Sequence, residues 1–246
     1  MRNIPPATKH LLIINCILYF AVALTTGRGG EHPLDVLMLY YPASEHFGVW
    51  QFVTYMFMHG GFAHLFFNMY SLWLFGAVVE QQLGTKRFLI LYFVAGIGAA
   101  LLHTGVQYLQ YMQEFNVYLG RLTDALPMLD SEQIRLYAQE HFVDEYLQPW
   151  GVEAICPPTL GASGAIYGVM MAFAVLNPRA ELQLIFPPVR LTAGWMVVIF
   201  GAIEILTGVF ATADGVAHFA HLGGMLFAFF LVLYWKKHLY DNYWNN

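Results

Sequence analysis

The sequence predicts an all-α membrane protein whose helices cross the bilayer six times. Hydrophobic residues make up 58% of the 246 residues, whereas charged residues make up only 11%. The mean hydropathy of +0.52 is far above that of a typical water-soluble domain. The charges are confined to short segments, and six apolar stretches lie between these segments.

Each apolar stretch is a candidate membrane helix. The stretches are Leu11–Leu24, Phe62–Val79, Phe88–His103, Leu160–Leu176, Leu191–Phe210 and Val216–Tyr234. Several are shorter than the roughly 20 residues that a straight span needs. We therefore expect a locally thinned bilayer or helices that end below the membrane surface. The first stretch lacks a convincing small-residue cleavage site, so we interpret it as a span and not as a secretory signal peptide.

The basic residues predict the orientation of the chain. With six spans, both termini lie on one side of the membrane. Only Arg28, Arg121 and Arg135 of the eleven Lys and Arg residues fall on the other side. Because cytoplasmic loops are enriched in Lys and Arg, both termini are predicted to be cytoplasmic. We expect an integral, multi-pass protein of the bacterial inner (plasma) membrane.

A polar segment, residues 106–158, separates the third and fourth apolar stretches. It carries eight acidic and two basic side chains, a balance that gives no indication of nucleic-acid binding. Asp130-Ser131-Glu132 is typical of a helix start, and Gln148-Pro149-Trp150-Gly151 of a helix end. We expect two or three short helices that cover the outer surface, as an extramembrane insertion within a single membrane domain of residues 1–246.

One of the four serines lies in a context that suggests a nucleophile. Ser163 is part of Gly161-Ala162-Ser163-Gly164, where Gly161 and Gly164 allow close approach of the backbone. A serine hydroxyl needs a base to remove its proton, and imidazole titrates near neutrality. His221 opens the sixth stretch and is the favoured base. No acidic residue adjoins it within that stretch, so we expect a Ser–His dyad and not a triad.

The predicted topology brings the polar groups to one depth. The second, fourth and sixth stretches run inward from the outside, and His64, Ser163 and His221 each lie near the start of one of them. These groups therefore fall in the outer leaflet, within reach of water. His64 and Asn68 share a helix face, so both could donate to an oxyanion together with amides at the start of the Ser163 helix.

Small residues predict close packing of the fourth and sixth helices. Gly164 and Gly168 form one strip of small residues, and Ala220, Gly224 and Ala228 form another. Strips of this kind would let the two helices approach closely enough for the Ser163 hydroxyl to reach the His221 imidazole.

The cysteines and histidines indicate no cofactor. Cys16 lies within the first stretch and Cys156 outside the membrane, so no disulfide is expected. The sequence contains no Cys/His zinc spacing and no His-Glu-x-x-His motif, so neither a metal site nor another cofactor is expected.

Three motifs resemble those of the rhomboid family of intramembrane serine proteases. They are Gly161-Ala162-Ser163-Gly164, His64-Leu65-Phe66-Phe67-Asn68 and Ala220-His221-Leu222-Gly223-Gly224. The resemblance runs from about Trp50 to Tyr234. It implies the six-transmembrane-helix rhomboid fold, with Ser163 as nucleophile and His221 as general base. It also implies that His64, Asn68 and the Ser163 amide form the oxyanion hole.

The resemblance assigns supporting roles as well. Tyr167 matches the aromatic residue that supports the catalytic imidazole, and His59 and Glu80 look like polar positions that brace the second span and its loop. The family often has Trp-Arg in the first external loop, where this chain has Trp50-Gln51. The segment between the third and fourth spans is also longer than is usual in the family.

Three function classes remain open. The favoured one is a serine endopeptidase that cleaves single-span membrane proteins near the outer end of their transmembrane segment. The alternatives are a catalytically inactive rhomboid-like binding protein and a small transporter. The expected partners are transmembrane protein substrates and membrane lipid, with no nucleic acid; the sequence does not reveal the oligomeric state.

Three further polar residues have open roles. His218 competes with His221 as base, and the family context favours His221. His103 is expected to be structural. Glu204 lies inside the fifth apolar stretch, where an acid costs free energy and marks either a proton path or a hydrogen bond.

Overall fold

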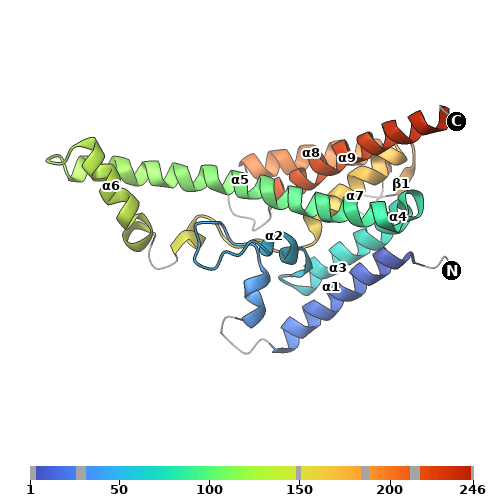
Figure 1. The fold of residues 1–246 in the computed structure, drawn as a ribbon, viewed down its shortest axis with the longest axis horizontal. Coiled ribbons are helices and arrows are strands. Elements are labelled where there is room, and N and C mark those ends of the chain that lie inside the picture. Colours follow the sequence, from blue (N-terminus) through green and yellow to red (C-terminus); the bar gives the residue numbers. More distant parts are fainter. Residues whose placement is uncertain (1–3, 26–31, 148–150, 184–188, 211–216, 245–246) are drawn as a thin grey trace.

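The computed structural model has a bundle of apolar helices from which one long helix projects at one end (Figure 1). The structure describes residues 4–25, 32–147, 151–183, 189–210 and 217–244. The beginning of the first helix and the end of the last helix lie at the same end of the bundle, opposite the tip of the projecting helix (Figure 1).

The described residues include five helices that are long and apolar enough to cross a membrane, judged by length and composition. They are α1 (Pro6–Thr25), the continuous run Phe62–Leu83, α5 (Thr85–Ala125), α8 (Ala193–Phe210) and residues His218–Lys237 of α9 (His218–Trp244). The second run is made of α3 (Phe62–Ser71), a π-helical segment (Leu72–Gly76) and α4 (Ala77–Leu83). The fourth predicted stretch forms α7 (Ser163–Leu176), an apolar helix of 14 residues. The predicted all-α class is thereby confirmed.

The remaining elements are short. They are α2 (Gln51–Thr54), α6 (Ser131–His141), 3₁₀ segments at Pro33–Leu37, Tyr55–Phe57 and Gly151–Ala154, a π-helical segment at Phe142–Tyr146, and the strands β1 (Glu181–Gln183) and β2 (Arg190–Thr192). The two strands pair antiparallel, with Leu182 opposite Leu191. The sequence interpretation missed this hairpin and assigned Leu191 and Thr192 to the fifth helix, which begins at Ala193 instead.

The prediction of only short helices between the third and fourth spans is wrong for the first part of that segment. The third span continues without a break to Ala125, so α5 has 41 residues and is about 60 Å long at ~1.5 Å per residue. No proline occurs between Thr85 and Ala125 to interrupt the backbone ladder, and the first one afterwards is Pro127. About half of α5 therefore extends beyond the ~30 Å of a hydrocarbon core.

The start of α6 agrees with the prediction. The Asp130 carboxylate accepts hydrogen bonds from the amides of Glu132 (3.0 Å) and Gln133 (2.8 Å), and the Gln133 side chain accepts one from the Asp130 amide (3.0 Å). This reciprocal capping box satisfies amides that the first helical turn leaves free. The predicted helix end at Gln148–Gly151 falls largely on residues 148–150, outside the described residues.

The π-helical segment after α6 packs back onto the projecting part of α5. Tyr118 of α5 forms a small buried cluster with Ala138, Phe142 and Leu147. This cluster is separate from the main core of the bundle, so the projecting part of α5 and α6 form a small helical unit of their own.

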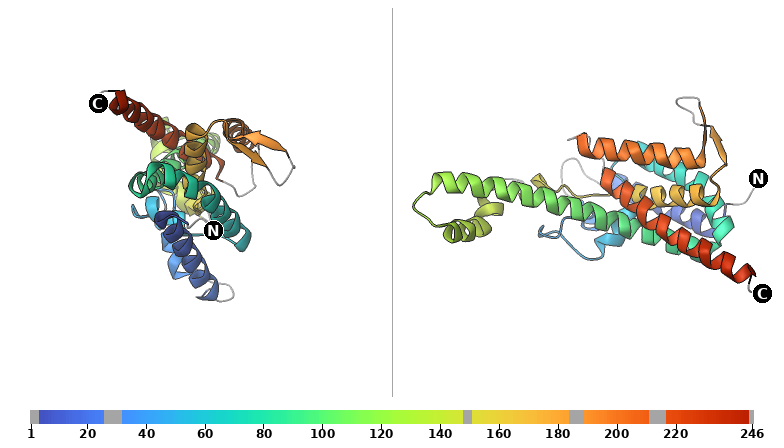
Figure 2. Two further views of the ribbon diagram at one scale, coloured as in Figure 1. Left: turned by 90° about the vertical axis from the view of Figure 1, so that its right-hand side faces the viewer. Right: turned by 90° about the horizontal axis from the view of Figure 1, so that it is seen from above.

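The helix α7 packs against both α5 and α9, which also contact each other (Figure 2). Backbone contact between small residues makes this possible. A Cβ atom on Gly224 would lie 1.8 Å from the Gly164 carbonyl oxygen, and one on Gly168 would lie 2.9 Å from the Gly224 carbonyl oxygen. The predicted close packing of the two small-residue strips is confirmed.

Two buried polar side chains hold the loops and termini in place. The Glu80 carboxylate accepts hydrogen bonds from the amides of Ala7 (2.9 Å) and Thr8 (2.7 Å), so it ties the start of α1 to α4. Gln51 is fully buried; its side chain accepts a hydrogen bond from the Tyr40 amide (3.1 Å) and donates one to the His46 carbonyl oxygen (2.8 Å). A neutral amide therefore anchors the loop between α1 and α2 at the position where the family often has an arginine.

Candidate active site

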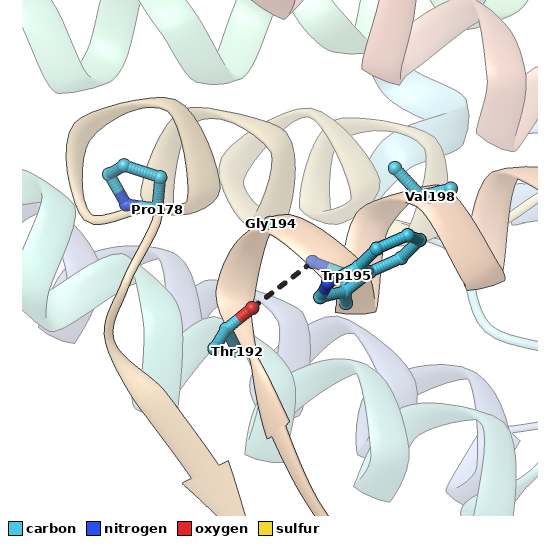
Figure 3. A pocket seen from close by; sticks show the side chains of 5 residues that line it. All are labelled: Pro178, Thr192, Gly194, Trp195 and Val198. Carbon is cyan, nitrogen blue, oxygen red and sulfur yellow. Dashed lines mark hydrogen bonds between the residues drawn. The ribbon is translucent and has the colours of Figure 1, made fainter.

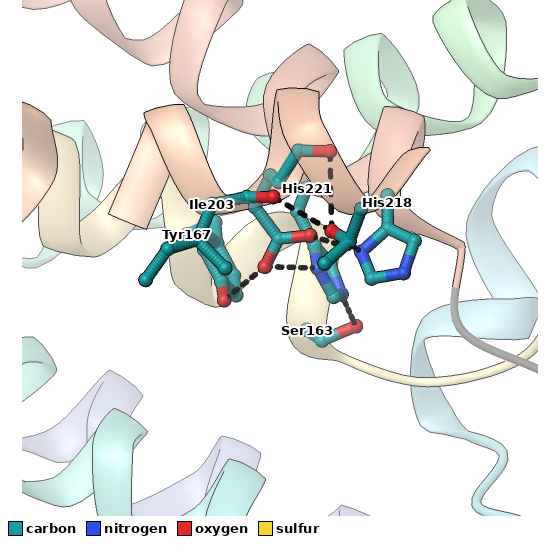
Figure 4. Close-up of polar contacts among 7 residues, drawn as sticks. Ser163, Tyr167, Ile203, His218 and His221 are labelled. Atoms are coloured by element: carbon teal, nitrogen blue, oxygen red, sulfur yellow. Dashed lines mark hydrogen bonds and ion pairs between the residues drawn. The ribbon is translucent and has the colours of Figure 1, made fainter. Parts of the chain in front are cut away.

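Ser163 and His221 face each other at the start of α7 and α9. The Ser163 hydroxyl lies 2.8 Å from Nε2 of His221, which is hydrogen-bonding distance (Figure 4). His221 lies in the first turn of α9, which begins at His218; Val216, where the predicted stretch begins, lies outside the described residues. His221 is only 8% exposed, whereas Ser163 is partly accessible.

The loop before Ser163 is fixed by bonds to three other segments. Thr159 and Leu39 exchange two backbone hydrogen bonds of 2.8 Å, and the Gly161 amide donates to the Tyr55 carbonyl oxygen at 2.9 Å. The Thr159 hydroxyl also lies 2.8 Å from Nε2 of His103, which agrees with a structural role for that histidine. These bonds determine where the first amides of α7 point.

Gly161 is required by its conformation and by its surroundings. Its φ of +125° lies in the left-handed region, which side chains rarely adopt. A Cβ atom at this position would lie 2.8 Å from Nε2 of His64 and 3.7 Å from the Ser163 hydroxyl oxygen. The His64 ring and the Ser163 hydroxyl therefore border the same small space.

His64 and Asn68 come from the first two turns of α3. Asn68 is 6% exposed, and His64 is partly buried. The His59 ring packs against the His64 ring with centroids 5.1 Å apart at 62°. Burial, followed by the proximity of His64, lowers the pKa of His59 to about 4, so this neighbour is neutral at pH 7.

Tyr167 supports the His221 ring from one side. The two rings are stacked, with centroids 4.2 Å apart and an angle of 3° between their planes. Tyr167 lies one turn after Ser163 on α7, so the same helix carries the serine and the surface on which the imidazole rests. Gly164, on the same helix, provides the close contact with α9 described above.

A carboxylate from α8 completes this group of side chains. Glu204 is 6% exposed, and its Oε1 lies 3.0 Å from Nδ1 of His221. Its Oε2 lies 2.6 Å from Nδ1 of His218, and Oε1 accepts a hydrogen bond from the Tyr167 hydroxyl (Figure 4). Sequence reasoning left Glu204 without a role; its one signal was an acid in an otherwise apolar helix.

The same residues could in principle hold a metal ion. One donor atom each from Glu204, His218 and His221 lies within 4.8 Å of the others. Histidine and carboxylate ligands suit zinc. In the structure these groups contact one another directly, and Nε2 of His221 contacts Ser163.

The hollow at the start of α8 and the two cysteines are weaker candidates for catalysis. A hollow beside the start of α8 is lined only by side chains without titratable groups, namely Pro178, Thr192, Gly194, Trp195 and Val198 (Figure 3). Cys16 and Cys156 are both free thiols. Burial raises the pKa of the Cys156 thiol to about 12, so this thiol is a poor nucleophile at pH 7.

Comparison with known proteins identifies the family. The family described as Rhomboid domain matches residues 46–238, a range that contains all the side chains of the site. Rhomboid protease GlpG of Yersinia pestis (strain Pestoides F) is 28% identical over 92 residues, which cover 37% of this chain and 32% of that protein. The protein of the same name from Yersinia pseudotuberculosis serotype O:3 (strain YPIII) aligns with the same values.

A eukaryotic relative aligns over more of the chain. Presenilin-associated rhomboid-like protein A, mitochondrial, of Danio rerio is 28% identical over 187 residues, which cover 74% of this chain and 37% of that protein. The chain thus spans less than two fifths of the length of each of these relatives. Since the matched family region includes both the apolar helices and the site between them, the chain is an integral membrane protein that belongs to the rhomboid family.

Proposed function

We propose that this protein is an intramembrane serine endopeptidase that cleaves single-span membrane proteins near the outer end of their transmembrane segment. The observation that carries this proposal is the 2.8 Å contact between the Ser163 hydroxyl and Nε2 of His221. A serine hydroxyl beside an imidazole nitrogen is the arrangement that makes the hydroxyl nucleophilic. Relatives named as rhomboid proteases support the same reaction class.

The reaction follows from this geometry. Nε2 of His221 takes the proton as the Ser163 oxygen attacks the scissile carbonyl carbon, and the carbonyl oxygen becomes an oxyanion. The oxyanion is stabilised by His64, Asn68 and the Ser163 amide. His221 then protonates the leaving amine as the peptide bond breaks. Water, deprotonated by His221, hydrolyses the acyl-enzyme and restores Ser163.

The length of α7 supports a site below the membrane surface. Its 14 residues rise about 21 Å at ~1.5 Å per residue, which is less than the ~30 Å of the hydrocarbon core. If α7 ends near one membrane surface, Ser163 at its start lies several ångströms inside the other. We infer six crossings with both termini in the cytoplasm of a bacterial inner membrane, and Ser163 in the outer leaflet.

Residues 106–158 then form an extramembrane insertion above the site, within one membrane domain. The insertion carries none of the proposed catalytic groups, and its α6 packs on the projecting part of α5. The end of the insertion is tied to α5, because the Cys156 thiol donates to the Gln107 carbonyl oxygen at 3.5 Å. The loop that precedes Ser163 begins directly after this contact.

The direct test is labelling with a fluorophosphonate probe, which forms a covalent bond only with an activated serine. The purified full-length protein is expected to be labelled once, at Ser163, as located by mass spectrometry. Ser71→Ala serves as a control and keeps the label, whereas Ser163→Ala loses it. A folded wild-type protein that is neither labelled nor active on a transmembrane substrate would instead be an inactive rhomboid-like protein.

A further inference from the structure

The Glu204 carboxylate lies where three helices meet. Glu204 comes from α8, Tyr167 from α7, and His218 and His221 from α9. Both carboxylate oxygens are engaged, since Oε1 contacts Tyr167 and His221 whereas Oε2 contacts His218. The side chain is almost completely buried in a helix that is otherwise apolar.

Burial of such a group opposes folding unless it is well compensated. A carboxylate in an apolar environment loses the hydration that stabilises its charge, and its partners must compensate for that loss. One hydrogen bond between helices needs only a neutral side chain such as Thr, Asn or Gln. The presence of an acid with three polar partners therefore points to a role for its charge.

The role follows from which imidazole nitrogen of His221 the carboxylate approaches. Nε2 of His221 lies 2.8 Å from the Ser163 hydroxyl, and the other ring nitrogen, Nδ1, lies 3.0 Å from Oε1 of Glu204. A neutral imidazole carries one proton, and only the tautomer protonated at Nδ1 leaves Nε2 free to accept the serine proton. A carboxylate at Nδ1 favours this tautomer and stabilises the imidazolium that forms on attack.

We propose that Glu204 is the positioning residue of a Ser163–His221–Glu204 triad. This inference rests on the proposed protease function, and it adds a third member to the Ser163–His221 pair expected from the sequence. Nδ1 keeps its proton throughout the reaction, Nε2 receives the Ser163 proton and later gives it to the leaving amine, and Glu204 stays ionised. The Tyr167 hydroxyl and Nδ1 of His218 hold the carboxylate beside the His221 ring, with Oε1 3.0 Å from Nδ1 of His221.

The test compares Glu204→Gln with Glu80→Gln in the full-length protein. Glu80 is a matched control because it is also buried in an apolar helix and also has several donors, but these lie on α1 and at the start of α5. We expect Glu204→Gln to lower kcat for a single-span substrate by about 10²- to 10⁴-fold with little change in KM, because the amide no longer enforces the tautomer. Glu80→Gln is expected to lower Tm while kcat per folded molecule stays at the wild-type value.

The outcomes separate this inference from the proposed function. If the wild type cleaves and Glu204→Gln cleaves with the same kcat per folded molecule, the triad is refuted and the protease function stands. If the folded wild type does not cleave, the protease function itself fails. Partial recovery of kcat in Glu204→Asp, which retains the charge, supports the triad.

A second measurement requires no Glu204 variant to fold. In protein labelled with ¹⁵N-histidine, the nitrogen shifts report which ring nitrogen carries the proton, and the His221 signals are assigned from their loss in His221→Ala. At a pH where the imidazole is neutral, the proposal requires the proton on Nδ1. A proton on Nε2 would overturn it.

Chelation tests the metal alternative at these residues. Because His221 acts as an acid–base group in the triad, activity is expected to survive dialysis against EDTA. Activity that disappears on chelation and returns with added Zn²⁺ would assign Glu204, His218 and His221 to a metal site and overturn the triad.

Discussion

At the scale of single residues, the account depends on which histidine serves Ser163. His221→Ala is expected to remove nearly all activity, because no base then lies at 2.8 Å from the hydroxyl. His218→Ala removes the contacts of His218 with Glu204 and with the Thr207 hydroxyl but leaves the contact between Ser163 and His221 in place. We therefore expect a loss of about tenfold, the rate equivalent of one charge-assisted hydrogen bond of ~1.5 kcal/mol. Initial cleavage rates per folded molecule of the two variants show which histidine is the base. Survival of activity in His221→Ala would show that the wrong histidine was assigned.

A second prediction at this scale concerns the oxyanion hole. Asn68→Ala is expected to lower kcat by roughly ten- to a thousandfold, short of elimination because His64 and the Ser163 amide still stabilise the charge. Asn15→Ala is the matched control, since Asn15 is also a buried asparagine but donates to the Leu11 carbonyl oxygen within α1. An Asn68→Ala variant with wild-type kcat would remove Asn68 from the site.

The sequence indicated some of the site residues and not others, for a physical reason. Ser163 and His221 each lie in a short motif, so the neighbouring residues in the sequence are enough to identify them. Glu204 comes from a different helix, and no pattern along α8 tells which of its faces meets α9. Gln51 was likewise noted only as a departure from the family, because its three backbone partners belong to a loop of irregular structure.

At the scale of helices, the contact between α7 and α9 depends on glycine. Gly224→Ala would bring a Cβ atom to 1.8 Å from the Gly164 carbonyl oxygen, so the two helices must separate. We expect a loss of about 1–3 kcal/mol in the free energy of unfolding, and a larger loss of activity because Ser163 and His221 move apart.

Gly105→Ala is the control for this substitution. Gly105 lies on α5, and no atom lies within 4 Å of its ideal Cβ position. Alanine is therefore expected to leave activity unchanged and to stabilise the helix by up to about 1 kcal/mol. Thermal unfolding in detergent measures both variants. Equal Tm values for Gly224→Ala and the wild type would argue against close packing at this point.

The sequence predicted helices better than it predicted their ends. Hydropathy marks the part of a helix that lies in lipid, because backbone groups in the bilayer must bond within the helix. It does not mark where the helix stops, so the continuation of α5 from His103 to Ala125 was missed. The strands β1 and β2, with three residues each, are too short to produce a recognisable alternation.

At the scale of the whole molecule, the proposed depth of Ser163 in the membrane predicts where a substrate is cut. The peptide bond must leave its helix before Ser163 can attack, since helical amides are already hydrogen-bonded. We therefore expect cuts near the outer end of a substrate's transmembrane segment, next to Gly, Pro or other helix-weakening residues. Mass spectrometry of the products locates the bond. Repeated cuts in the inner half of the segment would contradict the inferred orientation.

The central claim is that Ser163 makes this rhomboid protein a protease. The most direct measurement is cleavage of a model single-span substrate by the purified protein in liposomes, with wild type, Ser163→Ala and Ser71→Ala side by side. The account predicts cleavage by the wild type and Ser71→Ala, and no cleavage by Ser163→Ala at an unchanged Tm. Substantial cleavage by the folded Ser163→Ala protein would contradict it.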